Sequence, residues 1–177
     1  MKKLLIAYSS RTGNTKKVAE ALYYAAKDRC VIEESKNVTN LEEYSLVFVG
    51  YWVDKGGPDK ESQDFLRRLR NKRIVLFQTL GADPLSDHAL GCFANAGRYI
   101  DESCRVLGGI SIRGAIDPKL IERMSKLPEG HPHAPGPESK KRWQDAASHP
   151  DRQDLEKAAA SMKRYVEMYD KYFAKTE

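Results

Sequence analysis

Seven small or polar residues follow the first apolar run and form the strongest candidate binding motif in the sequence. They read Ser9-Ser10-Arg11-Thr12-Gly13-Asn14-Thr15. Successive main-chain N–H groups in such a turn, with a helix N-terminus behind them, attract a phosphate group. Hydroxyl and amide side chains can add donors, and glycine permits a positive φ. We therefore predict phosphate binding by Ser10, Arg11, Thr12, Gly13, Asn14 and Thr15.

The motif lacks the residues of two common nucleotide sites. It has neither the Walker pattern nor the dinucleotide pattern G-x-G-x-x-G, which argues against an ATPase and against a conventional NAD site. A binding loop of this kind needs no catalytic lysine. We predict no catalytic side chain and no metal ligand in the site.

The elements around the motif alternate between strand and helix patterns. Apolar runs at 3–8, 30–32, 46–49, 74–77 and 106–112 are typical of strands, and helical spacing occurs at 14–27, 60–70 and 86–101. Five strands that alternate with helices predict an α/β fold with a parallel sheet. In such sheets, ligands bind at the carboxyl ends of the strands, where the motif lies.

The chain changes character after residue 113. Residues 117–127, 138–148 and 151–173 read as helices, with Asp151 as the N-cap of the last one, and a loop rich in Pro and Gly separates the first two. Segment 114–150, at ~37 residues, is too short to bury a core of its own. We therefore predict one domain over residues 1–177, with segment 114–150 packed on the sheet domain.

Composition narrows the environment and the partners. No apolar run reaches the ~20 residues that span a bilayer, and three cysteines without C-x-x-C spacing favour a reducing cytoplasm. The net charge of +5 comes from 30 basic and 25 acidic residues mixed along the chain, so nucleic-acid binding is not indicated. One basic cluster stands out. It faces solvent or docks an acidic partner, and it consists of Arg67, Arg68, Arg70, Lys72 and Arg73.

The motif and its position resemble the flavodoxin family, whose phosphate loop commonly reads T/S-x-T-G-x-T. Residues 10–15 match this pattern directly after the first strand. The resemblance implies a doubly wound five-stranded parallel sheet of order 2-1-3-4-5, here with a helical C-terminal extension near the cofactor. It also implies one non-covalently bound FMN and electron transfer between redox partner enzymes.

The resemblance further implies that loops after the third and fourth strands enclose the flavin ring. The corresponding residues are Tyr51, Trp52, Val53, Asp54, Lys55 and Gly56, followed by Thr79, Leu80, Gly81 and Ala82. Tyr51 and Trp52 can each cover a flavin face or pack in the core. A peptide within 54–56 can rotate so that its carbonyl accepts a hydrogen bond from flavin N5. Alternatively, it forms a simple hairpin-like turn.

This chain departs from better-known flavodoxins in two ways. The loop after the fourth strand lacks an aromatic residue, so Leu80 or a residue of 114–150 would cover the outer flavin face. The long segment 114–150 is more similar to a less-studied branch found in anaerobic bacteria, some of whose members are accessories to flavin- or iron–sulfur-dependent reductases. An FMN-dependent reductase acting on NAD(P)H and a quinone or another small acceptor is the alternative function.

Two other patterns suggest different chemistry. Cys92 and Arg98 match C-x5-R, the phosphate-binding signature of tyrosine phosphatases, but they lie in a predicted helix. His131 and His133, together with His149, could offer imidazole ligands to a metal, although no cysteine or acidic cluster lies beside the first two. A chance match within a helix explains the first pattern. Turn residues that hydrogen-bond to the main chain or face solvent explain the second.

Overall fold

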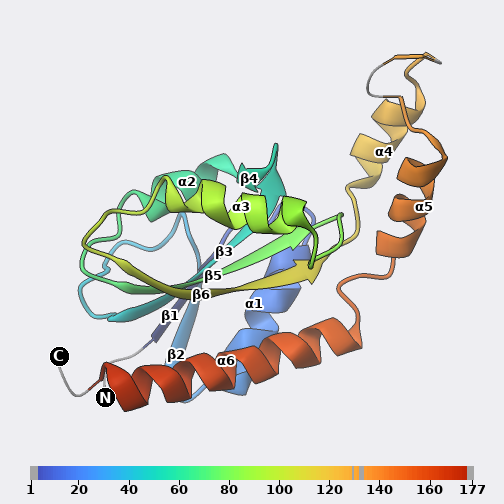
Figure 1. The fold of residues 1–177 in the computed structure, drawn as a ribbon. Helices are drawn as coiled ribbons and strands as arrows, with labels where there is room; N and C mark the ends of the chain where they lie inside the picture. Colours follow the sequence, from blue (N-terminus) through green and yellow to red (C-terminus); the bar gives the residue numbers. More distant parts are fainter. Residues whose placement is uncertain (1–3, 129, 132–133, 175–177) are drawn as a thin grey trace.

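The computed structural model describes residues 4–128, 130–131 and 134–174. A twisted sheet forms the middle layer and helices cover both of its faces (Figure 1). Helices α2 and α3 lie on one face, and α1 and α6 lie on the other. The predicted α/β architecture is confirmed.

Five parallel strands build the sheet in the order β2-β1-β3-β5-β6. Their bounds are β1 (Leu4–Tyr8), β2 (Cys30–Glu34), β3 (Leu46–Asp54), β5 (Arg73–Leu80) and β6 (Arg105–Arg113). The two-residue strand β4 (Gly57–Pro58) pairs antiparallel with the end of β3 and lies outside this path. The predicted order 2-1-3-4-5 is therefore confirmed.

The helices begin and end close to the predicted bounds. They are α1 (Asn14–Ala25), α2 (Lys60–Leu66), α3 (Asp87–Gly97), α4 (Pro118–Ser125), α5 (Pro137–Ala146) and α6 (Arg152–Tyr172). The central strands are buried on both faces, which gives two cores. Val18, Leu22 and Met162 contribute to the core under α1 and α6, while Phe65 and Leu69 contribute to the core on the α2 and α3 side.

Asp151 caps α6, as predicted. Its side chain accepts the N–H of Asp154, and the Asp154 side chain accepts the N–H of Asp151, which is a reciprocal capping box. The capped helix then runs back along the sheet beside α1 (Figure 1).

Helices α4 and α5 form an arm, described at residues 117–128, 130–131 and 134–148, that stands out from one end of the sheet (Figure 1). The prediction that segment 114–150 packs on the sheet domain stays a prediction. At the base of the arm Ala115 N–H donates to the His149 carbonyl, so the two ends of the segment meet. Trp143 of α5 is buried. In the described part of the chain, no helix is long and apolar enough to cross a membrane.

Candidate functional site

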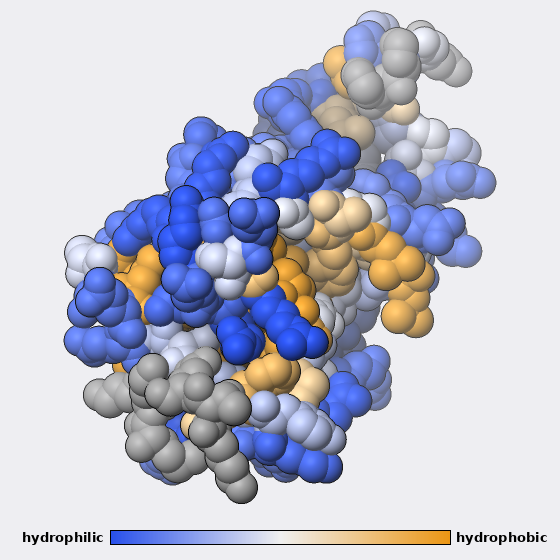
Figure 2. Space-filling view, turned by 60° about the vertical axis from the view of Figure 1, so that its left-hand side comes forward, coloured by the Kyte–Doolittle hydropathy of each residue, from blue (hydrophilic) through white to orange (hydrophobic). Residues whose placement is uncertain are grey.

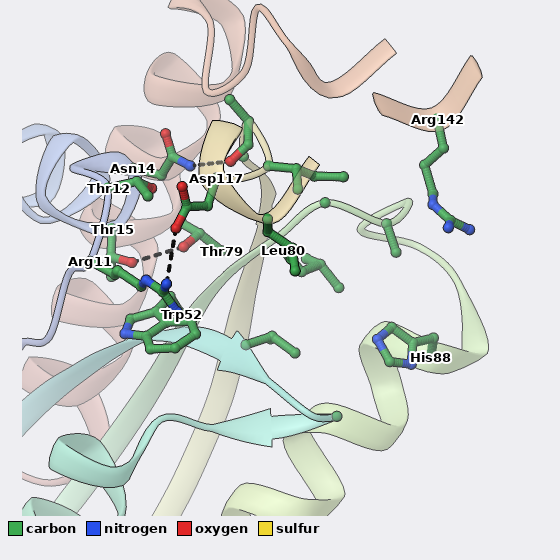
Figure 3. A pocket seen from close by; sticks show the side chains of 18 of the residues that line it. Arg11, Thr12, Asn14, Thr15, Trp52, Thr79, Leu80, His88, Asp117 and Arg142 are labelled. Atoms are coloured by element: carbon green, nitrogen blue, oxygen red, sulfur yellow. Dashed lines mark hydrogen bonds and ion pairs between the residues drawn. The ribbon is translucent and has the colours of Figure 1, made fainter. Parts of the chain in front are cut away.

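A pocket of about 750 Å³ opens at the carboxyl ends of the strands, beside the arm (Figure 3). The segments that follow β1, β3, β5 and β6 meet there, together with Leu120 of α4 and Arg142 of α5. The predicted phosphate and flavin residues line it except Ser10, Gly13, Tyr51 and Asp54. The structure therefore brings twelve of the sixteen residues named from the sequence together in one pocket.

The turn between β1 and α1 forms an anion-binding loop. Gly13 precedes α1 with φ of 94°, a left-handed conformation that favours glycine. Within the described ranges, the main-chain N–H groups of residues 11–15 meet no hydrogen-bond acceptor. The first turn of α1 contains no acidic residue that would repel an anion. These unpaired donors at a helix N-terminus fit a phosphate group.

Hydroxyl groups extend this loop on its inner side. Thr15 Oγ1 lies 2.8 Å from Thr79 Oγ1, and both threonines are buried at the base of the pocket. Ser10 is used differently, because its hydroxyl accepts the N–H of Lys16 at 3.2 Å. The loop is also tied to α2, since Ser9 donates to the buried carboxylate of Asp59 at 2.9 Å.

Two side chains of the loop point to the base of the arm. The Asn14 amide donates to the Ala115 carbonyl at 2.8 Å, and the Arg11 guanidinium lies 3.1 Å from the Asp117 carboxylate (Figure 3). Arg11 also lies over the Trp52 ring, 5.4 Å from its centroid. The structure therefore engages Arg11 and Asn14, which we predicted as phosphate donors, in contacts with residues 115–117 and with Trp52.

The two predicted aromatic residues have different roles. Trp52 is half-buried and lines the pocket. Tyr51 is fully buried in β3 and donates to Gln78 Oε1 at 3.0 Å. Burial raises the pKa of the Tyr51 hydroxyl well above its usual range, which keeps it a donor. Tyr51 is thus a core residue, because alternate residues of a strand face opposite sides of the sheet.

Residues 54–57 form the hairpin turn between β3 and β4. Lys55 and Gly56 have φ of 49° and 81°, the two positive values of a tight hairpin turn. The Gly56 carbonyl accepts a hydrogen bond from the Asn95 amide of α3 at 2.8 Å. Lys55 and Gly56 line the pocket, whereas Asp54 does not.

Several pocket residues escaped the sequence reasoning. Asp83, Ser86 and His88 extend the predicted loop into α3, and residues 114–117 extend β6 toward the arm. The second group had a readable signal, because it follows the last strand and must lie at the same edge of the sheet as the other loops. The sequence gives no such signal for Arg142, because helical periodicity does not reveal the direction of the arm.

The basic cluster of residues 67–73 lies at the other end of the sheet. Arg73 begins β5, whereas the pocket lies at its end near Leu80. Members of the cluster have partners within the protein, since Arg67 pairs with Asp64 at 2.9 Å, Arg70 pairs with Asp101 at 3.2 Å and Arg68 donates to the Val38 carbonyl at 2.6 Å. Figure 2, turned toward this end, shows a surface dominated by hydrophilic side chains. Docking of an acidic partner at the cluster stays a prediction.

The phosphatase pattern is helix packing. Cys92 lies within α3 and is buried, and Arg98 is the C-cap of the same helix. Burial raises the pKa of the Cys92 thiol, which is opposite to the activation that a nucleophilic cysteine needs.

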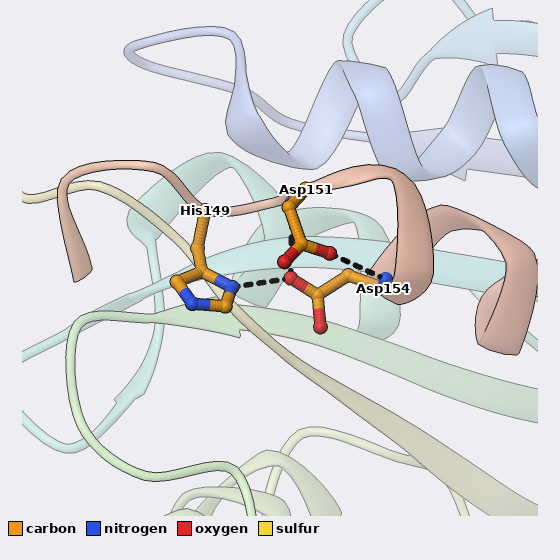
Figure 4. A group of neighbouring side chains, drawn as sticks. All are labelled: His149, Asp151 and Asp154. Atoms are coloured by element: carbon orange, nitrogen blue, oxygen red, sulfur yellow. Dashed lines mark hydrogen bonds and ion pairs between the residues drawn. The ribbon is translucent and has the colours of Figure 1, made fainter. Parts of the chain in front are cut away.

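Three histidines are candidate metal ligands, namely His131, His133 and His149. His133 lies outside the described residues. His149 lies beside Asp151 and Asp154, with ligand atoms within 4.8 Å of one another (Figure 4). His149 Nδ1 contacts Asp154 Oδ2, and both carboxylates take part in the capping box of α6. Helix capping accounts for this group.

The parallel sheet and the pocket at its carboxyl edge define a doubly wound binding domain with an anion loop after the first strand. A family model described as flavodoxin domain matches residues 5–163. The chain therefore belongs to the flavodoxin domain family.

Two relatives are both described as "Flavodoxin-like domain-containing protein BilS". The one from Clostridioides difficile (strain CD3) is 32% identical over 171 residues, which cover 93% of this chain and 96% of that protein. The one from Clostridium symbiosum (strain WAL-14163) is 25% identical over 147 residues, covering 73% and 77%.

A solved structure has the same fold. Oxidised Flavodoxin 2 from Bacillus cereus matches with a TM-score of 0.58 and 19% identity, over 94% of this chain and 99% of that one. At this identity the likeness supports the fold alone.

Proposed function

We propose that this chain binds one FMN in the pocket and carries electrons between redox partner proteins of the cytoplasm. The observation that carries the proposal is the set of free main-chain N–H groups at residues 11–15. They would hold the FMN phosphate, with Thr12 and Thr15 adding hydroxyl donors. The flavin would supply the redox chemistry.

The chain's own residues orient the ring and limit its contact with water. Trp52 offers an aromatic surface on one side of the pocket, and stacking on it is worth ~0.5–1.5 kcal/mol beyond burial. Leu80 also lines the pocket and would cover the other face of the ring, in place of the aromatic residue that the loop after the fourth parallel strand lacks. The main chain at residues 55–56 and 79–82 would contact the polar edge of the ring. No side-chain acid or base is needed.

The partners would be flavin or iron–sulfur reductases that approach the mouth of the pocket. A cytoplasmic location is supported by the three cysteines, which lack the spacing of a disulfide framework. The pocket also carries polar side chains beyond the flavin loops, namely Asp83, Ser86, His88 and Arg142. A substrate bound there would favour the alternative function, an FMN-dependent reductase of small molecules.

One experiment separates the two functions. The FMN-loaded protein is reduced by light without oxygen and then mixed with cytochrome c, a one-electron acceptor. An electron carrier reduces cytochrome c rapidly but oxidises no NAD(P)H by itself. Steady NAD(P)H oxidation by the purified protein with menadione, faster than with an equal concentration of free FMN, would instead establish the reductase. Failure to bind FMN would contradict both.

A further inference from the structure

The pocket has two ends that differ in chemistry. Thr12, Asn14 and Thr15 lie at the inner end, whereas His88 and Arg142 lie at the outer end (Figure 3). The loops that would contact FMN finish at residue 82. The outer end is formed by the start of α3 and by the arm, and therefore extends beyond the residues that the cofactor needs.

Arg142 is a cation without a carboxylate partner. In the described ranges, no acidic group lies within ion-pair distance of its guanidinium, although it lines the pocket. Two acids also line the pocket, namely Asp83, which accepts the N–H of Leu85 at 2.9 Å, and Asp117, which pairs with Arg11. Trp143, the next residue of α5, is buried and fixes the helix that carries the exposed Arg142. The planar guanidinium of Arg142 matches a carboxylate or a sulfonate.

Apolar side chains lie beside this cation. Ile116 and Leu120 line the pocket, and Ile116 packs so closely on Gly81 that a Cβ there would lie 2.6 Å from Cγ1. Leu85 and Leu90, which are 90% and 62% exposed, neighbour the pocket residues Ser86 and His88 in sequence but do not line the pocket. An apolar wall beside a charged group is typical of a small-molecule site.

We propose that the outer end of the pocket binds a small organic anion with an apolar body, and that Arg142 anchors its acidic group. Ile116 and Leu120 hold the apolar part. The position of this ligand next to FMN rests on the proposed function. The binding of the ligand does not rest on it.

A matched pair of fluorescent probes tests the proposal on the FMN-loaded protein. Anilinonaphthalene sulfonate is an apolar anion, and phenylnaphthylamine has the same aromatic body without the charge. We expect Arg142→Gln to weaken binding of the sulfonate about fivefold to tenfold and to leave the neutral probe unchanged. Arg142→Lys should restore part of the affinity. Lys141→Gln, which removes the neighbouring charge outside the pocket lining, should have no effect.

The outcomes separate this inference from the proposed function. Equal sulfonate binding by the wild type and Arg142→Gln would overturn the inference. A second result would also overturn the inference. If each FMN molecule added to the FMN-free protein displaces one bound sulfonate molecule, the outer end belongs to the flavin site. A protein that binds no FMN but binds the sulfonate through Arg142 would remove the proposed function and keep the anion site. Far-ultraviolet circular dichroism checks that each variant is folded.

Discussion

Two glycine-to-alanine substitutions should change stability in opposite directions, and the reason is backbone conformation alone. A Cβ built on Gly13 or on Gly91 meets nothing within 4 Å, so neither substitution creates a clash. Gly13 has φ of 94°, whereas Gly91 lies exposed inside α3. The two sites thus differ in φ and not in space.

The magnitudes follow from known backbone costs. Alanine in a left-handed conformation costs ~1–2 kcal/mol, so Gly13→Ala should lower the free energy of unfolding by this amount. Glycine inside a helix is ~1 kcal/mol worse than alanine, so Gly91→Ala should raise it by about 1 kcal/mol. For a chain of this size, each kcal/mol shifts the melting temperature by roughly 2–4 °C. Thermal unfolding of the FMN-free proteins, followed by circular dichroism, measures both shifts.

Binding gives a second readout of the same pair. Gly13→Ala must move the N–H groups at the start of α1 away from their present directions, so its affinity for FMN should fall. Gly91→Ala should bind FMN like the wild type. The reasoning is refuted if the two variants shift stability in the same direction, or if Gly13→Ala binds FMN normally.

Other substitutions test the assignments of single side chains. Tyr51→Phe leaves Gln78 Oε1 without its hydrogen-bond donor, so it should destabilise the fold by ~1–3 kcal/mol with unchanged FMN affinity. Trp52→Leu should instead weaken FMN binding up to about tenfold. Chemical denaturation and flavin fluorescence measure the two effects, and a large loss of FMN affinity in Tyr51→Phe would contradict the assignment. Burial raises the pKa of the Cys30 thiol to about 11. Iodoacetamide at pH 8 should therefore alkylate the half-buried Cys104 faster than Cys30. Mass spectrometry measures the two rates, and equal rates would contradict this expectation. Because folding raises this pKa, the contribution of Cys30 to stability is fully present below the ordinary thiol pKa and is lost as pH rises through about 11, which unfolding curves at increasing pH would reveal.

Much of the fold could be predicted because each element carries a local signal. The buried parallel strands read as apolar runs, Gly13 marks the turn before α1, and Asp151 marks the start of α6. The phosphate loop combines its motif with its place after the first strand, and this combination located the pocket.

The remaining errors have physical causes. Tyr51 and Trp52 looked alike in sequence because β3 continues to Asp54, further than its apolar run indicated, and the pleat then directs the two side chains oppositely. The arm could not be placed because helical periodicity gives a buried face but no direction in space. Arg142 was therefore invisible as a pocket residue until α5 was seen beside the strand ends.

The central claim is that the loop after the first strand holds the phosphate of FMN. Titration of the FMN-free protein with FMN and with riboflavin, followed by quenching of flavin fluorescence, tests it most directly. We predict binding of one FMN per chain, with riboflavin bound at least tenfold more weakly because it lacks the phosphate. Equal affinity for the two flavins, or no binding of either, would contradict the account.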